Sequence, residues 1–187
     1  MDAPMWQKAA SFAARAHTGQ LRKDGATPYV AHVFRVAMTV RDLFGCDDPV
    51  ALVAALLHDT IEDTTTDYDD LREAFGADVA DLVAALTKNA ALPEEEREPE
   101  YDARLAAADW RARLIKLADT YDNLSDTLVH QGQPEYPKLE KAIGKARRAL
   151  ELARADAAWN PTMARAMAMV HELAGGETRP GQEAPPE

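Results

Sequence analysis

The sequence predicts an all-α protein, a bundle of about eight to ten helices. Apolar residues recur every three or four positions along nearly every segment, which is the spacing of a buried helix face. No segment shows the strict alternation that is typical of a strand. Glycine and proline stand between the periodic segments, where they end one helix and begin the next. These three observations together favour a helical bundle.

The length and composition indicate one globular domain. A chain of 187 residues has room for a sizeable core, and its 47% hydrophobic and 28% charged residues are ordinary for a soluble protein. We find no internal repeat and no second domain. We therefore expect residues 1–174 to form the domain. Residues 175–187, which are rich in Gly, Pro and Glu, are expected to be a disordered tail.

Charge and cysteine content limit the location and the partners. No apolar run approaches the roughly 18 residues that a membrane span requires, and the N-terminus lacks the pattern of a secretory signal. Cys46 is the single cysteine, which fits a reducing cytoplasm. The net charge of −11 should repel nucleic acid and anionic membranes. We expect a cytoplasmic protein with a small-molecule partner and with neither nucleic acid nor membrane as a ligand.

Five helices are expected in the first half of the chain. The third is the central one, because it begins at Asp48-Pro49, a cap followed by proline at the first helical position, and is apolar nearly all round. A polar loop over residues 17–28 separates the first two. The expected helices cover residues 4–16, 29–44, 49–63, 68–75 and 77–87.

The second half is expected to begin with a loop over residues 88–99, which holds two prolines and the acidic run of residues 94–98. A short helix from Pro99 then precedes a long one over residues 110–130, which carries Asp119 and Asn123 on one face. The last two expected helices cover residues 136–155 and 161–173.

The strongest functional signal is the segment AALLHDTIED at residues 54–63. On a continuous helix, residues four apart share a face, so His58 would lie beneath Glu62 and Asp59 beneath Asp63. Four ionisable groups on an otherwise apolar helix are hard to explain as solvated surface. We therefore expect a hydrolytic site centred on a metal ion.

Two imidazoles and two carboxylates on different helices suit a borderline divalent ion such as Mn²⁺, Fe²⁺, Co²⁺ or Zn²⁺. Such an ion lowers the pKa of a bound water, which Glu62 and Asp63 are close enough to orient or deprotonate. The candidate ligands are His32, His58, Asp59 and Asp119.

Spacing alone does not place two of these ligands. His32 could instead be a partly buried histidine at a helix start, and Asp119 could pair with Lys116. Both alternatives stay open on the residues by themselves.

Four motifs then occur in a fixed order. They are residues 16–25 (AHTGQLRKDG), 28–32 (PYVAH), 57–64 (LHDTIEDT) and 115–119 (IKLAD) followed by Asn123. Over about residues 5–130 the chain resembles the hydrolase domain of the RelA/SpoT-homology alarmone enzymes, in the HD superfamily, and we expect it to be of the small stand-alone type.

This resemblance implies an HD-type helical bundle and removal of the 3′-pyrophosphate from guanosine tetra- or pentaphosphate. It implies that one Mn²⁺ is held by His32, His58, Asp59 and Asp119. It also implies that Glu62 and Asp63 handle the water. The positions that match those facing the nucleotide are Arg22, Lys23 and Asn123.

The chain departs from the family pattern around the substrate. Val33 stands where the family usually has proline, Asp122 where it has His or Tyr, and Ser125 where an arginine is common. Thr120 replaces a basic residue, and the loop that is lysine-rich in small members is acidic at residues 94–98. The metal and water residues are complete, while the phosphate-holding periphery is depleted, so we expect a comparatively high KM.

Two other functions compete with this one. An HD phosphohydrolase could act on another nucleotide, such as a nicotinamide dinucleotide phosphate or a nucleoside phosphate. Alternatively, the chain could be a regulatory nucleotide-binding module without turnover. The presence of Glu62 and Asp63 counts against the second, because a binding protein needs no pair to activate water. The sequence does not indicate an oligomeric state.

Overall fold

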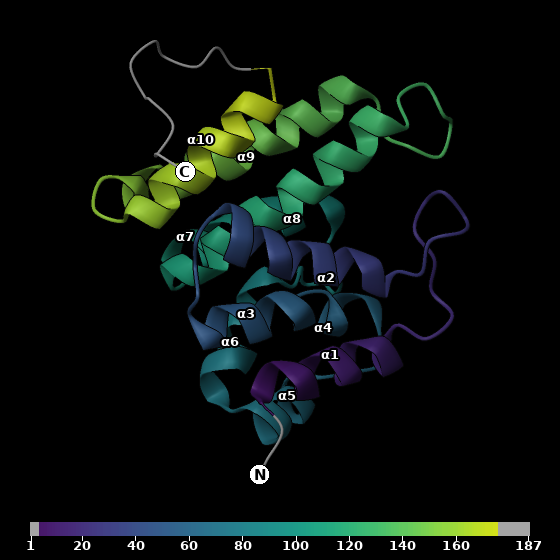
Figure 1. The fold of residues 1–187 in the computed structure, drawn as a ribbon, viewed down its shortest axis with the longest axis vertical. Coiled ribbons are helices and arrows are strands. Elements are labelled where there is room, and N and C mark those ends of the chain that lie inside the picture. Colours follow the sequence, from purple (N-terminus) through teal and green to yellow (C-terminus); the bar gives the residue numbers. More distant parts are fainter. Residues whose placement is uncertain (1–3, 176–187) are drawn as a thin grey trace.

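A computed structural model describes residues 4–175 and shows the all-α architecture that the sequence predicts (Figure 1). Within that range the chain forms ten α-helical segments and one π-helical segment, and the pairing of Leu21 with Pro28 is an isolated β-bridge. None of these helices is long and apolar enough to cross a membrane. Apart from its first residue, the predicted disordered tail lies outside the described residues.

The helices of the first half are α1 (Met5–Ala16), α2 (Val30–Met38), η1 (Thr39–Leu43), α3 (Pro49–Leu57), α4 (Thr60–Asp63), α5 (Tyr68–Phe75) and α6 (Ala77–Leu86). Those of the second half are α7 (Glu94–Ala107), α8 (Trp110–Val129), α9 (Leu139–Ala157) and α10 (Pro161–Leu173).

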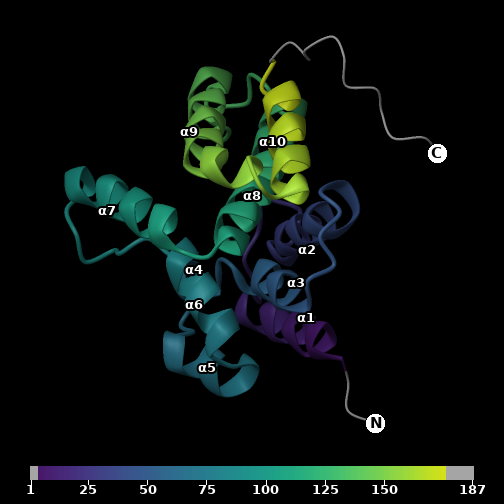
Figure 2. The same ribbon diagram turned by 90° about the vertical axis from the view of Figure 1, so that its left-hand side faces the viewer.

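Helix α8 runs through the middle of the molecule. It packs against α9 and α10 on one side and against α2, α3 and α6 on the other, as Figures 1 and 2 show. Its buried apolar residues, Leu114, Ile115, Leu117 and Leu124, are at most 1% exposed. Because α2, α3 and α8 meet here, polar side chains on their facing surfaces are brought together inside the protein.

Helix α3 is buried and begins as predicted. The Asp48 carboxylate accepts a hydrogen bond of 2.8 Å from the Ala51 N–H, and Pro49 follows the cap. Six of its nine residues are buried. Burial of this apolar helix against α1, α2 and α6 fixes the position of the residues that follow its C-terminus.

The third helix was predicted to run on to residue 63, and that prediction is wrong. Helix α3 ends at Leu57 and α4 begins at Thr60. The Thr60 hydroxyl donates to the Leu57 carbonyl at 2.7 Å, and His58 Nδ1 lies 2.9 Å from the Ala55 carbonyl oxygen. In a continuing helix both carbonyls would accept backbone N–H groups. Here side-chain hydrogen bonds take the place of those backbone bonds, and the helix ends.

The second predicted helix has the right extent but not a uniform form. Its last turn is the π-helical segment η1, in which the Phe44 N–H donates to the Thr39 carbonyl five residues earlier at 2.9 Å. Apolar spacing does not reveal such a change, because it alters the backbone bonding while Val40 and Phe44 remain buried.

The predicted loop over residues 88–99 is also wrong in its second half, because α7 already begins at Glu94 and contains Pro99 (Figure 2). The glutamates of the first turn are favoured at a helix N-terminus, where the backbone dipole is positive. Pro99 removes only the N–H that would bond the Glu95 carbonyl, and Glu95 is exposed to water. A proline near a helix start is therefore tolerated here.

Candidate metal centre and substrate cavity

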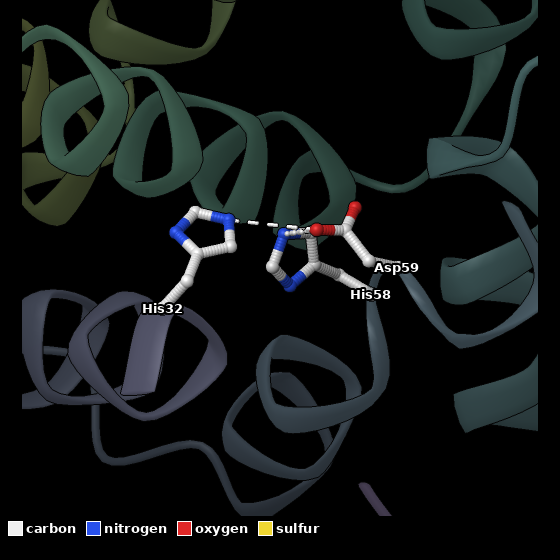
Figure 3. Close-up of side chains that lie close together, drawn as sticks. All are labelled: His32, His58 and Asp59. Carbon is white, nitrogen blue, oxygen red and sulfur yellow. Dashed lines mark ion pairs between the residues drawn. The ribbon is translucent and has the colours of Figure 1, made fainter. Parts of the chain in front are cut away.

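Three of the four predicted ligands form a compact cluster. His32 lies on α2, while His58 and Asp59 occupy the break between α3 and α4 (Figure 3). The Asp59 Oδ2 atom is 3.4 Å from His32 Nε2 and 3.1 Å from His58 Nε2. Both histidines are buried, at 1% and 3% exposure. The helix break thus turns both neighbours, His58 and Asp59, toward α2.

Asp119 approaches the same point from α8. Its Oδ1 atom lies 3.3 Å from His32 Nε2 and 3.9 Å from His58 Nε2. Its Oδ2 atom also accepts a hydrogen bond of 2.8 Å from Lys116 Nζ. The pairing with Lys116, which the sequence left open as an alternative, therefore exists together with the cluster. The Asn123 amide donates to Oδ1 at 2.5 Å. The structure therefore gathers all four predicted ligands from two helices, α2 and α8, and from the turn between α3 and α4.

The cluster fits a divalent ion. The Nε2 atoms of His32 and His58 are buried and have no hydrogen-bond partner within the described part of the chain, although buried ring nitrogens are normally satisfied. Two ligand atoms that each lie about 2.1 Å from one ion are about 3.0–3.4 Å apart, depending on the angle. The separations of 3.1–3.9 Å among the nitrogens and carboxylate oxygens are close to this range. Imidazole and carboxylate donors suit a borderline transition metal ion.

The electrostatics keep the carboxylates ionised. Burial opposes a charge on Asp119, but Lys116 and the two histidines outweigh it and hold the pKa of Asp119 below its usual range. Burial likewise opposes a charge on His32, yet the neighbouring carboxylates of Asp119, Asp122 and Asp59 raise its pKa to about 10. Protons and a metal cation would thus compete for the same concentration of negative charge.

The two predicted water-handling residues lie on α4 and have different surroundings. The Tyr29 hydroxyl bridges Asp63 to Asp59, at 3.0 Å and 2.6 Å from their Oδ2 atoms. Glu62 accepts a bond of 2.9 Å from the Lys88 backbone N–H. Burial and the nearby Asp59 charge raise the pKa of both carboxyls. Sequence reasoning missed Tyr29, whose only signal is its place three residues before His32.

Lys23 and Asn123 line a cavity of about 180 Å³ that adjoins Asp119. Arg22 does not line it, because its buried guanidinium donates to Asn123 Oδ1 at 3.0 Å and to Asp126 Oδ2 at 2.7 Å. Two of the three residues expected to face the nucleotide are therefore at the cavity. Arg22 instead holds the Asn123 side chain in place through its hydrogen bond, from outside the cavity.

Four further cations line this cavity, and sequence reasoning assigned none of them to the substrate. They are Lys88, Lys116, Lys145 and Arg148. Of the acidic run, only Glu98 lines the cavity, where Lys88 and Arg148 neutralise it. Lys23 and Lys145 have no carboxylate partner within residues 4–175. The positions at which sequence reasoning found a basic residue replaced carry no cation, but other cations, from α8 and α9, line the cavity.

A helical bundle that holds two buried histidines and two partly buried aspartates on α2, α8 and the turn after α3, beside a cavity rich in cations, is the architecture of a metal-dependent phosphohydrolase domain. The profile of the HD domain matches residues 9–145, and the chain belongs to this family.

Curated relatives support the same assignment. The human guanosine-3′,5′-bis(diphosphate) 3′-pyrophosphohydrolase MESH1 is 43% identical over 126 residues, which cover 67% of this chain and 70% of that protein. The MESH1 protein of Drosophila melanogaster is 43% identical over 121 residues, or 64% and 67% of the two chains. A solved structure of a metazoan ortholog of SpoT, which hydrolyses ppGpp, has a TM-score of 0.79 at 30% identity, with coverage of 92% and 95%.

Proposed function

We propose that this chain is a metal-dependent guanosine 3′,5′-bis(diphosphate) 3′-pyrophosphohydrolase. It would hydrolyse guanosine tetra- or pentaphosphate to GDP or GTP and pyrophosphate. The observation that carries this proposal is the juxtaposition of the His/Asp cluster with the cation-lined cavity, because Asp119 belongs to both. The names and the similarity of the MESH1 relatives support the same reaction.

The metal would be held by His32, His58, Asp59 and Asp119, and we propose Mn²⁺ as the natural ion. When bound, a divalent ion of this kind polarises a phosphoryl oxygen and lowers the pKa of a coordinated water. The four residues come from three separate elements, so a bound ion would also tie α2, α8 and the turn after α3 together.

Asp63 and Glu62 would orient the water and accept its proton. Their raised pKa values suit this role, because a general base works best when its pKa approaches the operating pH. Tyr29 holds Asp63 beside Asp59 through its bridging hydroxyl, so Asp63 is directed at the cluster. Glu62 is held by the backbone N–H of Lys88, a residue that also lines the cavity.

The cavity would hold the phosphates that are not cleaved. Lys23 comes from the loop before α2, whereas Lys145 and Arg148 come from α9, so cations face the cavity from separate parts of the chain. Asn123 lies at the boundary, where it contacts Asp119 and lines the cavity. A highly anionic nucleotide is therefore a better match than a neutral ligand.

Location and organisation follow the same reasoning. We infer a cytoplasmic protein that acts on a free nucleotide and not on nucleic acid, supported by the net charge of −11 and the single cysteine. We also propose that residues 1–174 are one HD-type hydrolase domain.

The test is a turnover assay on purified protein with Mn²⁺, compared with the same protein after chelation of metal. Guanosine tetraphosphate should give GDP and intact pyrophosphate, and Asp63→Asn should be a slow control with unchanged metal content. Release of orthophosphate alone would contradict the proposed reaction. No turnover of guanosine tetraphosphate while NADPH or a nucleoside phosphate is hydrolysed would favour the competing phosphohydrolase function.

A further inference from the structure

Asp122 is a buried carboxylate on α8 that lies behind the proposed metal centre. It is 5% exposed, and its Oδ2 atom accepts a hydrogen bond of 2.7 Å from Nδ1 of His32. The family pattern described above has His or Tyr at this position. A carboxylate buried here is therefore a property of this chain, and its contacts indicate what it does.

Both oxygens of Asp122 are engaged. Arg35 donates to Oδ1 from Nε at 2.5 Å and to Oδ2 from Nη2 at 3.0 Å, and Arg22 Nη2 lies 3.8 Å from Oδ2. A buried charge is costly unless it is paired and hydrogen-bonded. Arg35, which lies three residues after His32 on α2, supplies that pairing and fixes the carboxylate between the two helices.

The bond to Asp122 decides which nitrogen of His32 is free. An ionised carboxylate only accepts hydrogen bonds, so Nδ1 must carry the proton. In neutral His32 the lone pair then lies on Nε2, the atom that points at Asp59 and Asp119. His58 has the same arrangement, but its Nδ1 partner is the Ala55 carbonyl. A carboxylate partner orients the ring and makes it a stronger donor to a metal than a carbonyl does.

We propose that Asp122 is a positioning residue for His32, and that Arg35 holds Asp122 in the orientation that presents His32 Nε2 to the metal. This inference rests on the proposed metal centre but not on the identity of the nucleotide. Its test therefore measures metal binding, and a failure of the alarmone assay would leave it untouched.

The main variant is Asp122→Asn, which keeps the size but removes the charge and one of the two acceptor oxygens. Its single oxygen cannot accept from His32 Nδ1 and from Arg35 Nε together, because these two donors bind different oxygens of Asp122. Loss of the hydrogen-bond partner of a metal-binding histidine typically weakens metal binding about 10- to 100-fold. Mn²⁺ affinity, measured by calorimetry on metal-free protein, should fall by that factor. The matched control is Asp126→Asn, which removes the next carboxylate on the same face of α8. Asp126 pairs with Arg22 and Arg35 and makes no bond to His32, so Mn²⁺ affinity should change far less.

A spectroscopic signature separates positioning from a purely structural role. In protein loaded with diamagnetic Zn²⁺, the His32 Nδ1 proton should give a slowly exchanging downfield signal. Asp122→Asn should shift this signal upfield or abolish it, because an amide oxygen is a weaker acceptor than a carboxylate, and Asp126→Asn should leave it unchanged. Arg35→Gln, at a side chain that is 42% exposed, provides a second variant if Asp122→Asn does not fold, and it should weaken Mn²⁺ binding to a smaller degree. Unchanged Mn²⁺ affinity and an unchanged His32 signal in a folded Asp122→Asn or Arg35→Gln protein would overturn the proposal.

Discussion

The two sides of the site are built differently. In the His/Asp cluster the two histidines are buried and the two aspartates partly buried, and all four residues lie on or next to helices that pack in the core around α8. The facing wall of the cavity is made of long, flexible cations, and Lys23 and Lys145 are exposed to solvent. The side chains of the cluster, where the chemistry would take place, are therefore fixed in position. The side chains that would hold anions can adapt to the ligand. The two sides should therefore respond differently to mutation.

The largest effect is expected from His58→Ala. It removes one of four proposed ligands, so Mn²⁺ binding and turnover should both be lost. The thermal stabilisation of the protein by added Mn²⁺ should disappear as well, because binding free energy adds to folding free energy. Calorimetry and thermal unfolding with and without Mn²⁺ measure this. A variant that binds Mn²⁺ and gains as much stability from it as the parent would remove His58 from the site.

The next effect is expected from Asp63→Asn. We expect turnover to fall about 10²- to 10⁴-fold, the usual contribution of a general acid or base, with nearly unchanged metal content. The turnover of Glu62→Gln should fall by a similar factor if Glu62 also acts on the water. The measurement pairs single-turnover rates with metal analysis. Loss of metal from either variant would instead show that the carboxylate is a ligand.

The sequence predicted the buried side of the site better than the exposed side. His58 and Asp59 are neighbours in one motif, and His32 and Asp119 were placed with them only by the resemblance. The structure brings all four together. No local signal marks Lys145 or Arg148, because they reach the cavity through the packing of α9 on α8. Contacts between distant segments depend on the whole fold, so the local spacing of residues along the sequence cannot predict them.

The errors in the fold have a common cause. Helical spacing predicted nearly every helix, and α5 and α10 have the predicted bounds. The break after Leu57 depends on side-chain bonds from His58 and Thr60 to backbone carbonyls. Pro99 was taken as the start of a helix, whereas α7 begins five residues earlier. The break depends on individual hydrogen bonds and the start of α7 on glutamates at a helix N-terminus, and a pattern of apolar residues registers neither.

A smaller effect is expected from Lys145→Gln on the exposed wall. One charge-assisted contact with a phosphate contributes about 1.5–3 kcal/mol, so KM should rise roughly 10- to 100-fold while kcat changes little. Arg147→Gln is the matched control, because Arg147 lies on the same helix, is exposed and does not line the cavity. Equal KM values for the two variants would exclude Lys145 from substrate binding.

The smallest effect is a pH dependence that distinguishes the two sides. Partial burial and the nearby Lys116, Lys88 and Lys23 lower the pKa of Lys145. Lys145 is charged below its pKa, so its hold on a phosphate is lost as the pH rises through that value, and this loss begins at a lower pH than for a free lysine.

On the buried side, Asp63 must be deprotonated to act as a base. Burial and the Asp59 charge raise its pKa, so kcat should fall on acidification at a higher pH than for a free aspartate.

Profiles of kcat and KM against pH, measured with saturating Mn²⁺, can test this division. KM should rise on the alkaline side and kcat should fall on the acidic side. Lys145→Arg keeps the charge at all accessible pH values, because a guanidinium does not lose its proton there. It should therefore flatten the alkaline rise in KM and leave the acidic fall in kcat unchanged. An alkaline limb that persists in Lys145→Arg would exclude Lys145 as its source and would point to Lys23, whose pKa is also lowered by burial and by Arg22.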